Sequence, residues 1–152
     1  MGRLAFIVFK PNGETVYEET LVPAEVFQLI HGLKARKKHI CTLETMALIA
    51  VYINPNLQDS LRGADVNHFT DNTAANGAAI KGYSPAPDIA RLVGAYHLRI
   101  ARLGARIWIE YVPSAANIAD MPSRGNFELV ESIGAKRIPF IFPSLASWGA
   151  MQ

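Results

Sequence analysis

The chain has a single cysteine, Cys41, among its 152 residues. One thiol excludes an internal disulfide framework, argues against a thiolate zinc site and fits a reducing compartment. Long apolar runs are also missing: the first apolar stretch, in MGRLAFIVFKPNGE, is too short for a signal peptide or a membrane span, and no other stretch approaches that length without charges. We therefore expect a soluble intracellular protein without a membrane segment. The sequence does not distinguish cytoplasm from nucleus.

Charge is scarce and only slightly unbalanced. Charged residues make up 18% of the chain, half of the residues are hydrophobic, and the formal net charge is +2. This composition predicts one folded domain rather than a disordered chain. Basic residues nevertheless cluster in 34–39 and again at Arg91, Arg99, Arg102 and Arg106. Such clusters are most often solvated faces, but they are also what a phosphate-binding surface needs.

Local patterns predict alternating strands and helices. Two β-prone runs, 4–10 and 15–22, flank the turn residues Asn12-Gly13 and predict a hairpin. Further strands are expected at 65–70 and 105–112. Helices are expected at 24–30 with a stop at Gly32, at 42–53 with Thr42 as cap, at 72–80, and at 88–103 with Asp88 as cap. This order predicts a mixed α/β domain in which a hairpin leads into βα units.

Three acids stand beside these elements. Glu44 lies at the edge of an apolar helical stripe, Asp71 follows a strand, and Asp120 precedes Met121-Pro122-Ser123-Arg124. Each has an ordinary alternative: Asp71 as a helix cap, Asp120 as an ion-pair partner of Arg124, and Glu44 as a solvated or paired acid. Taken together, three acids beside core residues favour a shared divalent metal and hydrolysis. The four histidines offer no pair at metal-ligand spacing, and His68 within a strand favours a packed role.

The segments around these acids carry a family resemblance. TLETMA, FTDNTAANG and VPSAANIADMPSRG resemble the acid-bearing segments of ribonuclease H domains from retroelement reverse transcriptases, and the last is the most specific. The order of helix glutamate, strand-end aspartate and late aspartate is also similar. The resemblance covers residues 2–125 and implies a ribonuclease-H-like mixed sheet with flanking helices, followed by a C-terminal extension at 126–152. An integrase or exonuclease of the same superfamily is the weaker alternative.

The resemblance implies a metal site and a substrate. Glu44, Asp71 and Asp120 would be the catalytic residues and would hold two Mg²⁺ or Mn²⁺ ions, which oxygen ligands suit better than zinc. The substrate would be the RNA strand of an RNA–DNA hybrid. Asn72 and the arginine stripe of Arg91, Arg99 and Arg102 are the expected nucleic-acid contacts. A reverse transcriptase polymerase domain is the expected protein partner.

One departure from the family is as informative as the resemblance. Such domains open with a central strand that bears the first catalytic aspartate, whereas residues 2–8 here match the second strand, and no acid precedes Glu14. We therefore expect an N-terminally truncated fold with strand edges left unpaired inside the domain. A fragment of a polyprotein, a strand from a partner and a decayed gene copy are the three explanations. Enzymatic activity stays open, and the alternative is an inactive module that binds nucleic acid or packs against a polymerase.

Overall fold

The computed structural model describes residues 3–26, 39–85 and 87–142. The expected hairpin is present: β1 (Arg3–Phe9) pairs antiparallel with β2 (Thr15–Leu21), and Gly13 in the turn between them has a φ of 86°. A short β5 (Lys136–Arg137) joins the other edge of β2 in parallel. These three strands form a mixed sheet in the order β1-β2-β5.

The second half of the fold is a parallel βα unit. β3 (Asp65–Thr70) leads through α4 (Thr73–Lys81) and α5 (Pro87–Leu103) to β4 (Arg106–Tyr111), which pairs in parallel with β3. The predicted order of strands and helices and the mixed α/β class are confirmed. The expected caps at Gly32 and Asp88, part of the helix at 24–30 and the basic cluster at 34–39 lie outside the described residues or side chains.

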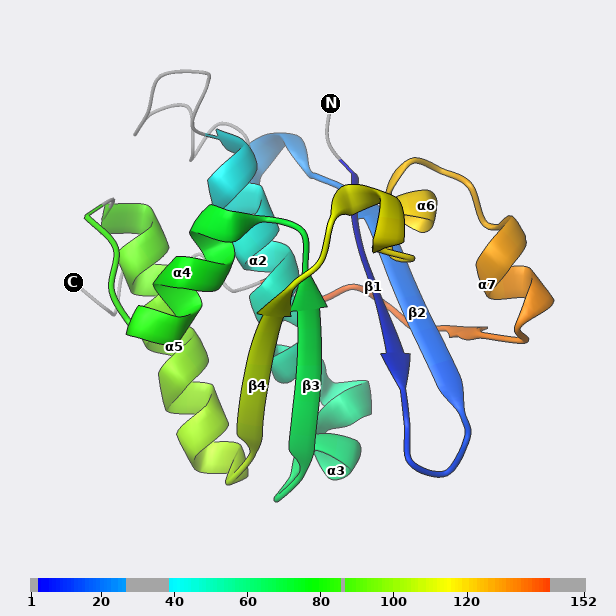
Figure 1. The fold of residues 1–152 in the computed structure, drawn as a ribbon, viewed down its shortest axis with the longest axis horizontal. Helices are drawn as coiled ribbons and strands as arrows, with labels where there is room; N and C mark the ends of the chain where they lie inside the picture. The colour runs from blue at the N-terminus through cyan, green and yellow to red at the C-terminus, as the bar shows by residue number, and fades with distance from the viewer. Residues whose placement is uncertain (1–2, 27–38, 86, 143–152) are drawn as a thin grey trace.

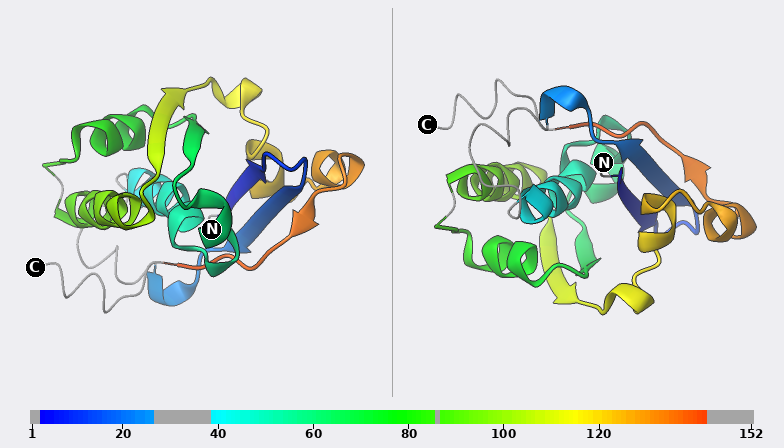
Figure 2. Two further views of the ribbon diagram at one scale, coloured as in Figure 1. Left: turned by 90° about the horizontal axis from the view of Figure 1, so that it is seen from below. Right: turned by 90° about the horizontal axis from the view of Figure 1, so that it is seen from above.

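The two sheets stand next to each other without forming one. In the described residues the ladders are β1-β2-β5 and β3-β4, and no ladder joins β1 to β3. Figure 1 shows β1 and β3 as the facing edges, with α2 (His39–Ile53) behind the β3–β4 sheet. The same arrangement is seen from above and below in Figure 2. Among the described residues, the backbone edges of β1 and β3 that face each other therefore have no strand partner.

Helix α2 is the centre of the core. Its residues Met46, Ile49, Ala50 and Tyr52 are almost fully buried, and the cluster around them includes residues of both sheets and α5. The sequence predicted one apolar stripe, but the helix is buried on several faces because β1, α4 and α5 all contact it. Thr42 is not its cap, since the helix begins at His39 and Thr42 is buried within it. No helix in the described ranges is long and apolar enough to cross a membrane.

Short elements complete the chain. After α2 come a 3-10 turn, η2 (Pro55–Leu57), and α3 (Gln58–Leu61); after β4 come η3 (Ser114–Ala116), α6 (Asp120–Ser123) and α7 (Glu128–Ser132). The apolar run 138–142 packs on the same core as the strands: Ile138 is buried, and the rings of Phe6 and Phe140 lie 5.7 Å apart. The stretch that follows Gly125 therefore contributes to the core formed by the first 125 residues.

Candidate functional site

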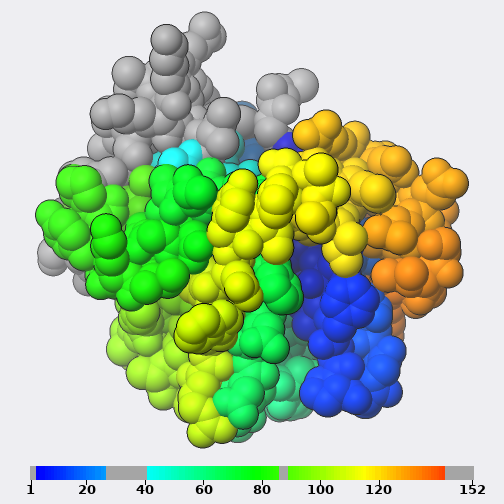
Figure 3. All heavy atoms as spheres, in the orientation of Figure 1, coloured from blue at the N-terminus to red at the C-terminus, as the bar shows by residue number. Residues whose placement is uncertain are grey.

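Three separate elements carry the three acids to one place. Glu44 lies on α2, Asp71 directly follows the end of β3, and Asp120 is the first residue of α6. Figure 3 shows the chain around α6 lying across the top of the molecule between β3 and the β1–β2 hairpin. One pocket beneath it has all three acids in its wall. Its lining residues are Arg3, Leu4, Ala5, Glu44, Ala47, Asp71, Asn117, Ala119, Asp120 and Ser123.

The electrostatics of this acid pocket reflect the proximity of its carboxylates. Burial, followed by the negative charges of Asp71 and Asp120, raises the pKa of Glu44 from 4.5 to about 7. Each of these influences disfavours the ionised form of Glu44. No cation is among the causes of this shift, so the pocket concentrates like charge around a half-buried carboxyl group.

Asp71 is held at the pocket without serving as a helix cap. The cap of α4 is Asn72, whose side-chain oxygen accepts a hydrogen bond from the Ala75 N–H at 2.8 Å. The alternative assignment of Asp71 as the cap is therefore wrong: the residue one position later has the extended backbone that an N-cap requires. Asp71 is one of the residues that line the pocket. The side-chain oxygen of Asn72, the residue expected to contact nucleic acid, accepts the hydrogen bond of the cap.

Asp120 is placed by the turns of the VPSAANIADMPSRG segment. The Asn117 side chain accepts a hydrogen bond from the Ala119 N–H, and the Asn117 carbonyl accepts one from the Asp120 N–H at 3.0 Å. Ser123 donates its hydroxyl to the Asp120 carbonyl. The expected ion pair with Arg124 is present at 3.0 Å, but Arg124 is 74% exposed, so the pair contributes little to stability.

The acid pocket fits a divalent cation in charge and in donor chemistry. All three acids offer carboxylate oxygens, the ligands that Mg²⁺ and Mn²⁺ prefer, and a cation would relieve the repulsion that raises the Glu44 pKa. Suitable donor atoms do not by themselves make a metal site, because the side chains must also converge on one point. Among the described residues, no group of three or more histidine, cysteine, aspartate or glutamate side chains is placed to hold an ion. The donors suit the metal, while a full set of ligands is not assembled.

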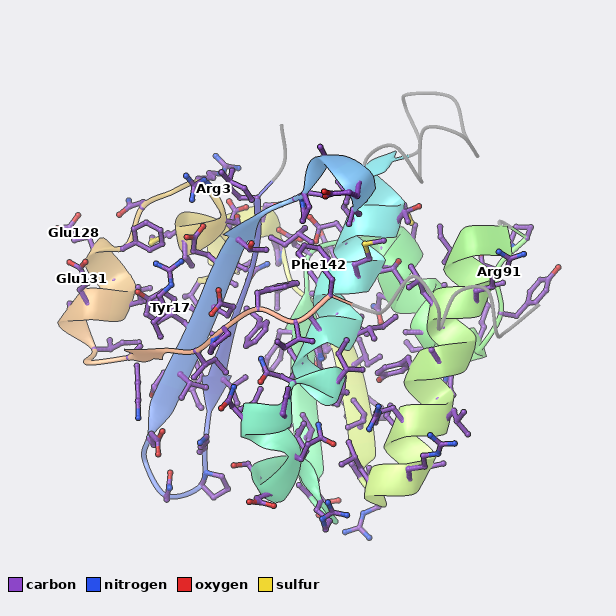
Figure 4. All side chains as sticks on the ribbon, turned by 180° about the vertical axis from the view of Figure 1, so that it is seen from behind. Arg3, Tyr17, Arg91, Glu128, Glu131 and Phe142 are labelled. Atoms are coloured by element: carbon purple, nitrogen blue, oxygen red, sulfur yellow. The ribbon has the colours of Figure 1, made fainter. Side chains whose placement is uncertain are left out.

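The arginine stripe of α5 lies away from the acid pocket. The Gly63 N–H donates to the Leu103 carbonyl at 2.8 Å, which ties the end of α5 to the start of β3. Asp71 follows the opposite end of that six-residue strand, roughly 20 Å away at the usual rise per residue. Arg99 and Arg102 therefore lie at the far end of the fold. Arg91, near the start of α5, is on the opposite flank from Arg3 in Figure 4.

Two histidines have structural roles. His68 accepts or donates a 2.7 Å hydrogen bond with the Tyr52 hydroxyl, and its burial lowers its pKa to about 4, so it is neutral at physiological pH. His97 contacts the Ala79 carbonyl at 2.7 Å. Neither lines the acid pocket, and the packed role expected for His68 is confirmed. The side chains of His31 and His39 lie outside the described part.

The sequence patterns missed three polar residues of the pocket. Asn117 and Ser123 lie within the VPSAANIADMPSRG segment, so their proximity to Asp120 could have been read from it. Arg3 carried no such signal, because it reaches the pocket from β1 through tertiary structure alone.

A second, apolar groove lies between α4, α5 and β4. Its walls are Ala79, Ile80, Tyr96, His97, Ile100, Ile107, Trp108 and Ile109. It contains no carboxylate, so it lacks the chemistry of the acid pocket.

Comparisons with known proteins leave the family open: no family model, curated protein or solved structure matches the chain.

Proposed function

We propose that this chain is the ribonuclease-H-like domain of a retroelement reverse transcriptase and that its acid pocket hydrolyses the RNA strand of an RNA–DNA hybrid. The observation that carries the proposal is the meeting of Glu44, Asp71 and Asp120 in one pocket, where the two aspartates help to raise the pKa of Glu44. Structural acids are normally paired with cations, because unpaired buried charge is costly. A cluster of like charges is typical of a metal-dependent catalytic site.

In this proposal each residue has a defined task. Glu44, Asp71 and Asp120 would hold the magnesium ions, and the chemistry that such ions would supply is activation of water and stabilisation of the leaving oxygen. Near neutral pH the Glu44 carboxyl group carries a proton for part of the time, so cation binding releases it and becomes tighter as pH rises. Asn117 and Ser123 fix the backbone at Asp120 and thereby the direction of its carboxylate.

The free edges of β1 and β3 support a further part of the proposal. The family places an aspartate-bearing strand between the two strands that correspond to β1 and β3, and these edges have no ladder partner in the described chain. Leu4 and Ala5 of β1 line the acid pocket, so the end of a strand inserted beside them would reach it. We propose that such a strand supplies the fourth carboxylate and completes the ligand set.

The test compares two proteins. One is the chain of 152 residues, and the other carries an additional Asp-bearing strand fused before β1. Cleavage of a labelled hybrid in Mg²⁺ is measured for both, with single-stranded RNA and duplex DNA as substrate controls. We expect efficient cleavage of the RNA strand only in the extended protein. Robust Mg²⁺-dependent cleavage by the bare chain would show that another residue replaces the fourth acid.

The second candidate is an inactive module that binds nucleic acid or packs against a polymerase domain. It is favoured by the absence of a complete chelating group among the described residues and by exposed apolar side chains such as Phe9, Phe69 and Trp108. An extended protein that binds the hybrid but does not cleave it would support this candidate.

A further inference from the structure

We infer that Arg3 is the phosphate-contacting cation of the acid pocket and that the buried Glu19 positions it. This inference rests on the proposed function, because the phosphate is that of the bound nucleic acid. It assigns to β1 a role in substrate binding for which the arginines of α5, at the far side and far end of the fold, are poorly placed.

Arg3 is the first residue of β1 and lies at the acid pocket. Arg3 is one of the residues that line the pocket of the three acids, and its side chain is 35% exposed, so it is accessible from solvent. Its ion-pair partner in the described chain is Glu19, at 2.5 Å between Nη1 and Oε2.

The Arg3 side chain is held by its ion pair with Glu19 on the neighbouring strand. Ala5 is the cross-strand partner of Glu19, so Arg3 is the diagonal neighbour of Glu19 on the same face of the hairpin. Glu19 is only 6% exposed and also binds Arg137 of β5 at 2.8 Å. Gly125 is also close, since a Cβ added there would lie 3.9 Å from the Arg3 Nε. Figure 4 shows Arg3 at the end of β1 that lies beside α6.

The donor geometry of the Arg3 guanidinium group suits a phosphate ligand. A guanidinium group has five N–H donors in a rigid fork, and Glu19 engages Nη1. A guanidinium fixed at the edge of a carboxylate pocket suits a phosphodiester, whose oxygens it can contact while the acids face the metal ions. Pre-organisation by Glu19 reduces the side-chain entropy lost when the phosphate binds.

The chain offers a matched control for this assignment. Arg3 and Arg137 both bind Glu19, but Arg137 does not line the pocket. Arg3→Gln and Arg137→Gln each remove one cation from the same buried carboxylate. A purely structural role for Arg3 predicts that both substitutions have the same consequences.

The experiment measures binding of a short labelled RNA–DNA hybrid over a range of salt concentrations. Calcium replaces magnesium, since it takes oxygen ligands in a looser geometry and neutralises the acids. We expect Arg3→Gln to weaken binding about tenfold or more and to lower the log–log salt slope by about 0.9. Arg137→Gln should leave both unchanged, and Arg3→Lys should restore the slope because it keeps the charge. Thermal unfolding of each variant shows how much of any loss in binding is due to reduced folding stability.

Three results would overturn the inference. If Arg3→Gln binds as the unsubstituted protein does, the Arg3 assignment fails while the proposed function stands. If Arg3→Gln and Arg137→Gln weaken binding equally, Arg3 is only a structural partner of Glu19. If the unsubstituted protein does not bind the hybrid at all, the proposed function fails and the Arg3 assignment fails with it.

Discussion

Glu19 and Glu44 are both shielded from solvent, but their surroundings are opposite. Glu19 on β2 lies between two arginines, Arg3 and Arg137, which neutralise it. Glu44 on α2 lies near Asp71 and Asp120, and burial together with their negative charges raises its pKa to about 7. Burial of a carboxylate stabilises a fold only when cations or donors surround it. The first acid is therefore organised for structure, and the second makes the fold less stable at neutral pH unless a cation binds.

The largest expected effect concerns activity. In the protein extended with an Asp-bearing strand, Asp71→Asn should lower hybrid cleavage at least about 100-fold, since loss of one ligand weakens metal-derived stabilisation of the transition state by several kcal/mol. Asp65→Asn is the control: Asp65 is the first residue of the strand that Asp71 follows, is exposed and pairs with Arg106. Equal losses in both variants would remove Asp71 from the catalytic site.

We expect the substitutions Glu44→Gln and Glu19→Gln to change the free energy of unfolding in opposite directions. The folded-state pKa of Glu44 lies above its ordinary value of 4.5, so its ionisation favours unfolding. This penalty is absent below pH 4.5, grows toward pH 7 and is complete above it. Without metal at pH 8, Glu44→Gln should stabilise the protein by at most on the order of 3 kcal/mol. The gain should vanish at pH 4.

Glu19→Gln should have the reverse effect at pH 8, since it leaves two arginines without their anion. We expect a loss of about 1.5–3 kcal/mol, the usual contribution of hydrogen bonds to charged groups. Urea unfolding in EDTA measures both variants. A Glu44→Gln protein that is destabilised as much as Glu19→Gln would contradict the distinction between the two acids.

Magnesium should offset the loss of folding stability that ionised Glu44 causes at neutral pH. At about 100 times its dissociation constant, a cation that binds only the folded state adds about 2.7 kcal/mol, which a thermal melt detects. The stabilisation should be larger at pH 8 than at pH 5.5, because a proton on Glu44 competes with the ion. Asp71→Asn should abolish it and Asp65→Asn should retain it. Equal stabilisation of both variants would place the ion elsewhere.

The smallest effect is expected from the arginine stripe. Replacing Arg99 and Arg102 by alanine should reduce hybrid affinity modestly and lower the log–log salt slope by up to about 0.9 for each lost phosphate contact. The reason for the modest size is their position at the far end of β3 from Asp71. Unchanged binding with reduced thermal stability would indicate a structural role for the stripe.

Most of the secondary structure followed from local patterns. The Asn12-Gly13 turn predicted the hairpin, and the apolar spacing of residues 89–103 predicted α5. Such signals depend on neighbours a few residues apart, and the dihedral preferences of a turn or helix are set at that range. The beginning of α2 was misplaced at Thr42 because burial, not capping, determines the environment of that residue. The cap of α4 was open to the same ambiguity, which the backbone conformation of Asn72 resolved.

The sequence by itself determined which acids stand at the ends and edges of which elements. Only the tertiary structure decided that Glu44, Asp71 and Asp120 share a pocket, that their charges raise the pKa of Glu44, and that Arg3 lies beside them. The physical reason is the separation along the chain of the residues that interact. Helix and strand formation are governed by contacts close along the chain, whereas the electrostatics of a pocket depend on side chains that the folded core brings together from distant segments.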